Sequence, residues 1–321
     1  MTNTKSKHIQ ILRGLAILAV VIIHTMPSGM YTVLLRPFFN FAVGLFLFLS
    51  GMLSDVNKYN PKKRILKVIV PYILWTLIYI VIKDFSNPTQ IPVEFIKHLI
   101  TGRAASTTYF IPLYCEFTLL IPLIDKLARS KFRYLGFLIT PIEVLLMRTL
   151  PVILGYDLNS YIEIIIKLSC LGWFTYFYLG YLMGNNLITV KASTKKLTAL
   201  LVASVPLQML ESYWRFSLGD TNSGTQMKLT AILTGSIFVI LAYRFVNSEK
   251  EYNFRILEFF GNHSFGIFFS HPAIKYFFNL IPLFFNYALF PLNTVIILAA
   301  DILLIIVFKK LLGKHSKYLA F

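Results

Sequence analysis

The sequence predicts an all-α integral membrane protein that crosses the bilayer about ten times, with both termini in the cytoplasm. Three observations predict this fold class. Of 321 residues, 56% are hydrophobic and only 14% are charged, and the mean hydropathy of +0.67 lies outside the range of soluble domains. The apolar residues form runs long enough to cross about 30 Å of hydrocarbon. The basic residues cluster in alternate segments between those runs.

Ten apolar runs give the expected spans in chain order. They cover residues 9–27, 37–53, 65–83, 107–124, 134–151, 162–184, 197–213, 227–246, 256–278 and 291–312. An even number of spans places both termini on one side, and a cytoplasmic N-terminus puts most of the 31 lysines and arginines inside, as the positive-inside rule requires. Because the intervening loops are short, we expect a single membrane domain over residues 1–321. The first run lacks a small-residue cleavage site, which predicts a retained helix.

Composition also excludes several classes of partner. The net charge of +17 arises from cations between apolar runs, which indicates topology and contact with anionic membrane lipids, not a nucleic-acid partner. Cys115 and Cys170 both lie in apolar runs, so we expect neither a disulfide framework nor a thiolate metal site. The six histidines show no ligand spacing such as His-x-x-x-His, so no metal is expected.

An arginine and a histidine lie inside the first apolar run. Arg13 and His24 are eleven residues apart, which places them on one helical stripe, about 16 Å apart along the axis. Ionisable groups within a membrane helix are costly, so the pair is a functional hypothesis. His24 could accept a proton from a hydroxyl as a general base during acyl transfer. The alternative is a hydrogen bond between helices.

The third run begins with a group of cations. Arg64 and Lys67 are three residues apart and share a helix face. With Lys62, Lys63 and Arg13 they form a basic cytoplasmic mouth that could bind the phosphates of a polyanionic cofactor. The alternative is plain positive-inside topology, which we favour for Lys58, Lys62 and Lys63.

Further polar residues lie inside later runs. Glu116 is expected at mid-depth in the fourth run and needs a partner, for which a histidine or arginine of the first helix is the natural candidate. For Glu143 and Asp301 we expect structural pairing. Ser264 and His271 are seven residues apart and share one face of the ninth helix, either as substrate-binding groups or, for His271, as an interface cap beside a proline kink.

Four stretches of the sequence carry a common pattern. They are RGLAILAVVIIH from Arg13 to His24, the phenylalanine-rich run into Ser50-Gly51, the helix start with Arg64, Lys67, Pro71 and Tyr72, and Ser264 to Ile267 followed by His271-Pro272. With these motifs the chain resembles the membrane-bound acyltransferase 3 family, whose members O-acylate bacterial cell-surface glycans. Lys67 stands where the family has arginine, and Tyr109 stands where its fourth helix often has tryptophan. No hydrolase-like domain follows, so we expect a stand-alone member.

The resemblance implies an acyl-CoA-dependent O-acyltransferase of the bacterial plasma membrane. Acetyl-CoA would bind from the cytoplasm through Arg13, Arg64 and Lys67, and His24 would act as the base, with Glu116 holding the imidazole. The residues expected to bind the acceptor, a cell-surface or lipid-linked glycan, are Tyr109, Ser264 and His271. Direct transfer and an acyl-histidine intermediate both stay open, as does assembly into a homo-oligomer or with a polysaccharide-synthesis partner. The alternative functions are a transporter or exporter of a glycan or lipid, and a catalytically silent partner of a polysaccharide synthase.

Overall fold

The computed structural model describes residues 3–84, 88–155, 169–282, 284 and 289–321, and within them it contains helices and turns but no strand. The longer helices are α1 (Asn3–Thr25), α3 (Phe41–Met52), α4 (Pro61–Asp84), α5 (Ile91–Thr101), α6 (Phe110–Arg129), α10 (Phe174–Gly184), α11 (Thr194–Ser217), α12 (Leu229–Val246), α13 (Arg255–Asn262), α14 (Ser264–Asn279) and α16 (Leu292–Leu312). The shorter helical pieces are α2 (Met30–Leu34), η1 (Arg36–Phe38), η4 (Arg133–Leu138), α7 (Ile139–Val144), a π-helical turn (Leu145–Thr149), α8 (Leu150–Leu154), η6 (Cys170–Trp173) and η7 (Gly313–Leu319). The all-helical prediction is confirmed for this part of the chain.

Within the described residues, five helical stretches are long and apolar enough to cross a membrane. They are Asn3–Thr25, Met30–Met52, Pro61–Lys83, Arg133–Leu154 and Leu229–Val246, and each overlaps a predicted span. The predicted runs 107–124, 197–213 and 291–312 each overlap one long helix, namely α6, α11 and α16. Part of the run 162–184 lies outside the described residues. The count of ten spans and the cytoplasmic termini stay predictions.

Two predicted segments differ from the structure. The run 256–278 is divided at His263 into α13 and α14, where Gly261 and Asn262, typical residues of a helix end, close α13. The polar stretch 83–103, expected as a loop, contains the helix α5. Its charged residues pair at helical spacing, Glu94 with Lys97 at 3.0 Å and with His98 at 3.2 Å, so polarity there does not prevent a helix.

The chain divides into two compact units, each built from two separate stretches of sequence. Unit 1 comprises residues 1–59 and 120–262, and unit 2 comprises residues 60–119 and 263–321. The expectation of one membrane domain over residues 1–321 stays a prediction.

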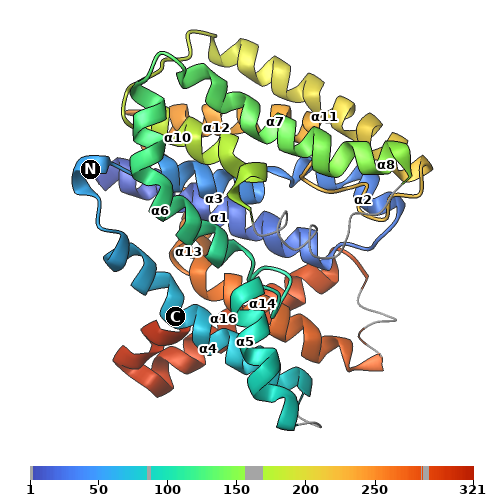
Figure 1. The fold of residues 1–321 in the computed structure, drawn as a ribbon. Helices are drawn as coiled ribbons and strands as arrows, with labels where there is room; N and C mark the ends of the chain where they lie inside the picture. The colour runs from blue at the N-terminus through green and yellow to red at the C-terminus, as the bar shows by residue number, and fades with distance from the viewer. Residues whose placement is uncertain (1–2, 85–87, 156–168, 283, 285–288) are drawn as a thin grey trace. The chain divides into compact units, whose positions relative to one another are not determined.

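In unit 1, α1 packs against α13 and α3, α3 against α10, and α11 against α12 (Figure 1). Glycines allow the closest of these approaches. A Cβ atom on Gly14 would lie 1.8 Å from the carbonyl oxygen of Leu257, and one on Gly261 would lie 1.9 Å from that of Gln10. The backbones of α1 and α13 are therefore in direct contact beside Arg13.

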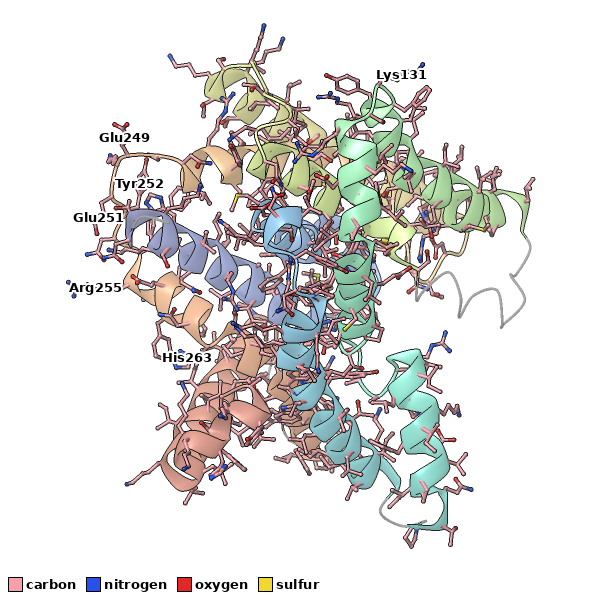
Figure 2. All side chains as sticks on the ribbon, turned by 60° about the vertical axis from the view of Figure 1, so that its left-hand side comes forward. Lys131, Glu249, Glu251, Tyr252, Arg255 and His263 are labelled. Atoms are coloured by element: carbon pink, nitrogen blue, oxygen red, sulfur yellow. The ribbon has the colours of Figure 1, made fainter. Side chains whose placement is uncertain are left out.

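The segment between α12 and α13 holds the first turns of α1 (Figure 2). Lys7 Nζ pairs with Glu251 Oε1 at 2.9 Å, and Lys5 Nζ donates a hydrogen bond of 2.9 Å to Asn247. The buried His8 ring lies between aromatic rings, with its centroid 4.6 Å from that of Phe245. Because the Lys7 ammonium lies beside it, the pKa of Glu251 is lowered.

In unit 2, α4 packs against α5 and η7, and α14 packs against α16 and α4. Trp75 joins three of these elements: its indole N–H donates to the carbonyl of Leu319 at 3.1 Å, and its ring stacks on Phe269 with centroids 6.2 Å apart. Tyr79 donates its hydroxyl to the carbonyl of Phe269. Aromatic side chains thus fix α4, α14 and the C-terminal turn around one core.

Candidate functional site

The first helix carries the arginine and the histidine singled out by their spacing. Arg13 and His24 lie on the unbroken α1, so their positions are about 16 Å apart along its axis, as predicted. Both side chains are partly exposed. Ile17 and Val20, which lie between them on the same stripe, are buried. One face of α1 therefore presents two ionisable groups at separate depths with apolar packing between them.

The second group of candidate residues begins α4. Arg64 is half-buried, its Nε donates to the hydroxyl of Tyr114 at 3.4 Å, and its Cζ lies 5.9 Å from the centroid of that ring. Lys67, one turn further along, is exposed. Nothing in the sequence pairs positions 64 and 114, so the sequence does not identify Tyr114 as a site residue. In the structure Tyr114 orients the guanidinium of Arg64.

The electrostatics of this helix start are unusual. Lys62 and Lys63 are exposed and add two cations to those of Arg64 and Lys67. The N-terminus of a helix carries a partial positive charge, so cations in the first turns are unfavourable there. Backbone N–H groups and side-chain cations at this position together favour a bound anion such as phosphate.

Tyr109 and Glu116 belong to the segment that leads into α6. Tyr109 immediately precedes α6, and Glu116 lies in the second turn of that helix; both are partly exposed. The backbone before Tyr109 is tightly fixed, because Thr108 Oγ1 donates to the carbonyl of Gly102 at 2.8 Å. Gly102 has a φ of +65°, and a Cβ there would lie 2.8 Å from Tyr109 Cα.

Ser264 and His271 lie on α14 and are both buried. His271 Nδ1 is 2.7 Å from the carbonyl oxygen of Ile267. Since a carbonyl only accepts, Nδ1 carries a proton, and in the neutral ring the lone pair is on Nε2. Full burial of His271 argues against the alternative of a cap at the membrane surface.

The two carboxylates expected to be structural do have polar partners. Glu143 Oε1 lies 3.2 Å from Arg148 Nε, although residues five apart do not share a face of an α-helix. The π-helical turn at Leu145–Thr149 changes the spacing and brings them together. Asp301 is buried and accepts a hydrogen bond of 2.5 Å from Ser270 Oγ.

The candidate residues are divided between the two units. Unit 1 holds Arg13 and His24, and the remaining six lie in unit 2: Arg64, Lys67, Tyr109, Glu116, Ser264 and His271. Within unit 2, Arg64 and Lys67 share the start of α4, and Ser264 and His271 share α14. The expected partnership of Glu116 with His24 stays a prediction.

Unit 1 also contains a buried polar cluster that the sequence analysis did not identify. The ammonium group of Lys228, in the segment before α12, is fully buried and donates to the carbonyls of Gln208 at 3.4 Å and Ser223 at 3.3 Å and to the hydroxyl of Ser212. Burial of an ammonium group is costly, and these three acceptors offset part of that cost.

The same cluster contains a buried ion pair. Arg215, at 3% exposure, pairs its Nε with Asp220 Oδ2 at 2.7 Å and donates from Nη2 to the carbonyl of Arg148 at 3.1 Å. Asn40 donates to the Gln208 side chain from the start of α3. The bonds join the end of α11 to the segment 218–228, so the cluster has a clear structural role.

Among the described residues, no group of three or more His, Cys, Asp or Glu side chains is placed to hold a metal ion. The helices and the ionisable groups within them define an all-helical membrane protein. A family model described as an acyltransferase domain matches residues 7–310. The chain therefore belongs to the acyltransferase-3 family and carries its acyl-transfer domain along nearly its whole length.

Relatives of this chain occur in Staphylococcus aureus. Proteins named "Probable poly-beta-1,6-N-acetyl-D-glucosamine export protein" in strains MRSA252 and MSSA476 are each 25% identical to it over 276 residues, which cover 83% of this chain and 76% of the relative. No solved structure matches the chain.

Proposed function

We propose that this chain is a multi-pass O-acyltransferase of the bacterial plasma membrane, which transfers an acetyl group from cytoplasmic acetyl-CoA to a hydroxyl of an extracytoplasmic glycan. The observation that carries the proposal is the Arg13 and His24 stripe on α1 in a chain of the acyltransferase-3 family. A thioester bound at the arginine end would extend its pantetheine arm along α1 toward the imidazole, over about 16 Å.

The basic start of α4 supports the donor site. Arg64, Lys67 and Arg13 would bind the phosphates of acetyl-CoA, and the hydrogen bond that Arg64 donates to the Tyr114 hydroxyl would hold its guanidinium in place. Because Lys67 is a point charge without a planar fork, we expect it to contribute charge more than orientation.

His24 would act as the general base. Its imidazole takes the proton of the acceptor hydroxyl while the hydroxyl oxygen attacks the thioester carbonyl. The carbon–sulfur bond breaks, the thiolate of CoA leaves, and the proton passes from the imidazolium to that thiolate. Glu116 would orient the imidazole as a carboxylate does in a catalytic triad. Tyr109, Ser264 and His271 would bind the glycan.

The relatives suggest the first glycan to test. Since their name refers to poly-β-1,6-N-acetyl-D-glucosamine, we propose a hydroxyl of this polymer, or of its lipid-linked form, as the acceptor. The same name favours a second function, export of the polymer without chemistry. Export predicts glycan movement with no release of CoA.

Release of free CoA by the purified protein in detergent tests the proposal. We would measure it with and without poly-β-1,6-N-acetyl-D-glucosamine for the wild type, His24→Ala and Arg64→Ala, together with acetyl-CoA binding. We expect His24→Ala to bind acetyl-CoA and to lose roughly 10²–10⁴-fold in turnover, and Arg64→Ala to raise the KM for acetyl-CoA about tenfold or more.

Two exposed residues outside the site serve as matched controls. His315→Ala removes a histidine and Lys131→Ala removes a cation at exposed positions, and both should leave turnover unchanged. If the wild type neither binds nor turns over any short acyl-CoA, the enzymatic proposal is wrong and export becomes the function to assay.

A further inference from the structure

The helix α5 exposes its apolar face, whereas a helix in water would expose its polar face. Val93, Ile96 and Ile100 are exposed by 67%, 58% and 67%. They recur at i, i+3 and i+7, so they form one apolar stripe on one side of the helix. The half-buried side holds Glu94 and His98, which pair at 3.2 Å. The polar pair therefore faces the protein and the apolar stripe faces outward.

The position of α5 along α4 sets its depth. Six residues join the end of α4 to Ile91, and the hydroxyl of Tyr72 donates to the carbonyl of Leu99 at 2.7 Å. Tyr72 lies twelve residues before Asp84, about 18 Å back from the end of α4, and the eleven residues of α5 span about 16 Å. α5 therefore folds back along the second half of α4, as Figures 1 and 2 show.

That half of α4 has the character of a membrane-spanning helix. Pro61–Lys83 is long and apolar enough to cross a bilayer. In its second half Ile73, Leu77 and Val81 are exposed by 38%, 41% and 38% and form a stripe four residues apart. An apolar stripe on a helix that crosses hydrocarbon contacts lipid. The stripe of α5 lies at the same level along α4 and is more exposed.

We propose that α5 enters the membrane part-way beside α4 and that Val93, Ile96 and Ile100 contact lipid acyl chains. Eleven residues are too few to cross about 30 Å, which agrees with a helix that enters and leaves on one side. Lys97 is exposed next to the stripe, and its long side chain can reach the headgroups while its stem stays apolar. The charge of Glu94 is balanced by its ion pair with Lys97 at 3.0 Å.

The inserted helix also bears on the candidate site. It ends at Thr101, and the carbonyl of the following Gly102 accepts a hydrogen bond from Thr108; a Cβ on Gly102 would lie 2.8 Å from Tyr109 Cα. Lipid contact by α5 therefore positions the segment 102–109, including Tyr109, at the membrane boundary. The lipid contact itself is independent of the proposed acyl transfer.

Spin-label accessibility in the full-length protein tests the proposal. In a background with Cys115→Ala and Cys170→Ala, single cysteines replace Val93, Ile96 and Ile100, and the labelled proteins are reconstituted into vesicles of phosphatidylcholine and phosphatidylglycerol. Power saturation then compares collision with oxygen, which concentrates in hydrocarbon, and with a water-soluble nickel chelate.

Reference positions define the oxygen-to-nickel ratios expected in lipid and in water. Leu77→Cys on α4 gives the lipid reference, and Lys131→Cys and Glu249→Cys, which are exposed polar positions labelled in Figure 2, give the water reference. We expect the oxygen-to-nickel ratio at positions 93, 96 and 100 to match that at 77 and to exceed the water reference several-fold.

Two outcomes would overturn the proposal. A ratio equal to that at Lys131 and Glu249 would place α5 in water, and protection from both reagents would mean that a protein surface covers the stripe. Each of the three positions gives an independent reading, so one variant that fails to fold does not remove the test. CoA release is not part of this measurement, so its outcome is distinguishable from failure of the acyltransferase proposal.

Discussion

Alanine at Gly14 should destabilise the protein, although alanine in a helix ordinarily stabilises it by about 0.5–1 kcal/mol relative to glycine. The added Cβ would lie 1.8 Å from the carbonyl oxygen of Leu257, whereas ordinary contacts begin at 3.4 Å. The backbones of α1 and α13 would have to separate by about 1.6 Å, and overpacking of this kind costs about 1–3 kcal/mol or more. A loss of stability in Gly14→Ala would therefore indicate the close contact, because helix propensity alone predicts a gain.

The assay is unfolding by sodium dodecyl sulfate in mixed micelles, followed by tryptophan fluorescence. Gly261→Ala should behave like Gly14→Ala, because its Cβ meets the carbonyl of Gln10 at the same crossing. Once one alanine has separated the helices, the second meets less resistance, so the double variant should lose clearly less than the sum of the single losses.

A crossing elsewhere in unit 1 provides the control. Gly180 makes the same type of contact with the carbonyl of Phe48, between α10 and α3. Gly14→Ala combined with Gly180→Ala shares no partner and should be additive within about 0.5 kcal/mol. A neutral or stabilising Gly14→Ala, or simple additivity with Gly261→Ala, would refute the reasoning.

Three further predictions concern the polar cluster and the topology. Lys228→Met removes the donor that the carbonyls of Gln208 and Ser223 and the hydroxyl of Ser212 use, so it should lower the stability by about 1–3 kcal/mol in detergent unfolding; an unchanged stability would contradict this. Asp220→Asn leaves the Arg215 guanidinium buried without a carboxylate and should cost about 3–5 kcal/mol in the same assay; a loss under about 1 kcal/mol would contradict it. With ten spans, an impermeant maleimide on intact cells should label Asn222→Cys and not Glu249→Cys, and labelling of both would refute the topology.

The sequence alone predicts the positions of most helices, because membrane helices are encoded by local hydrophobicity. It also sufficed for the common stripe of Arg13 and His24, which depends only on helical periodicity. It failed for α5, where Glu94, Lys97 and His98 raised the polarity of the stretch. The signal was nonetheless present, as Pro92 near the helix start and as the spacing of Val93, Ile96 and Ile100.

The remaining features depend on contacts between distant residues. The hydrogen bond between Arg64 and Tyr114 joins positions 50 residues apart, and that between Asn40 and Gln208 joins positions 168 apart. Lys228 resembles any loop cation in sequence, and only the tertiary packing makes it buried. The pairing of Glu143 with Arg148 was hidden for another reason, because the π-helical turn changes the helical spacing that sequence reasoning assumes.

The bonds of the polar cluster are close in sequence, which has a consequence for synthesis. Lys228 bonds to Ser212 and Ser223, and Arg215 bonds to Asp220, so these partners all lie in the hairpin formed by α11 and α12. Burying a lysine or arginine without its polar partners costs several kcal/mol. When both helices leave the translocon together, the two cations already have their partners. Asn40, made earlier by the ribosome, can then join the hairpin as it docks.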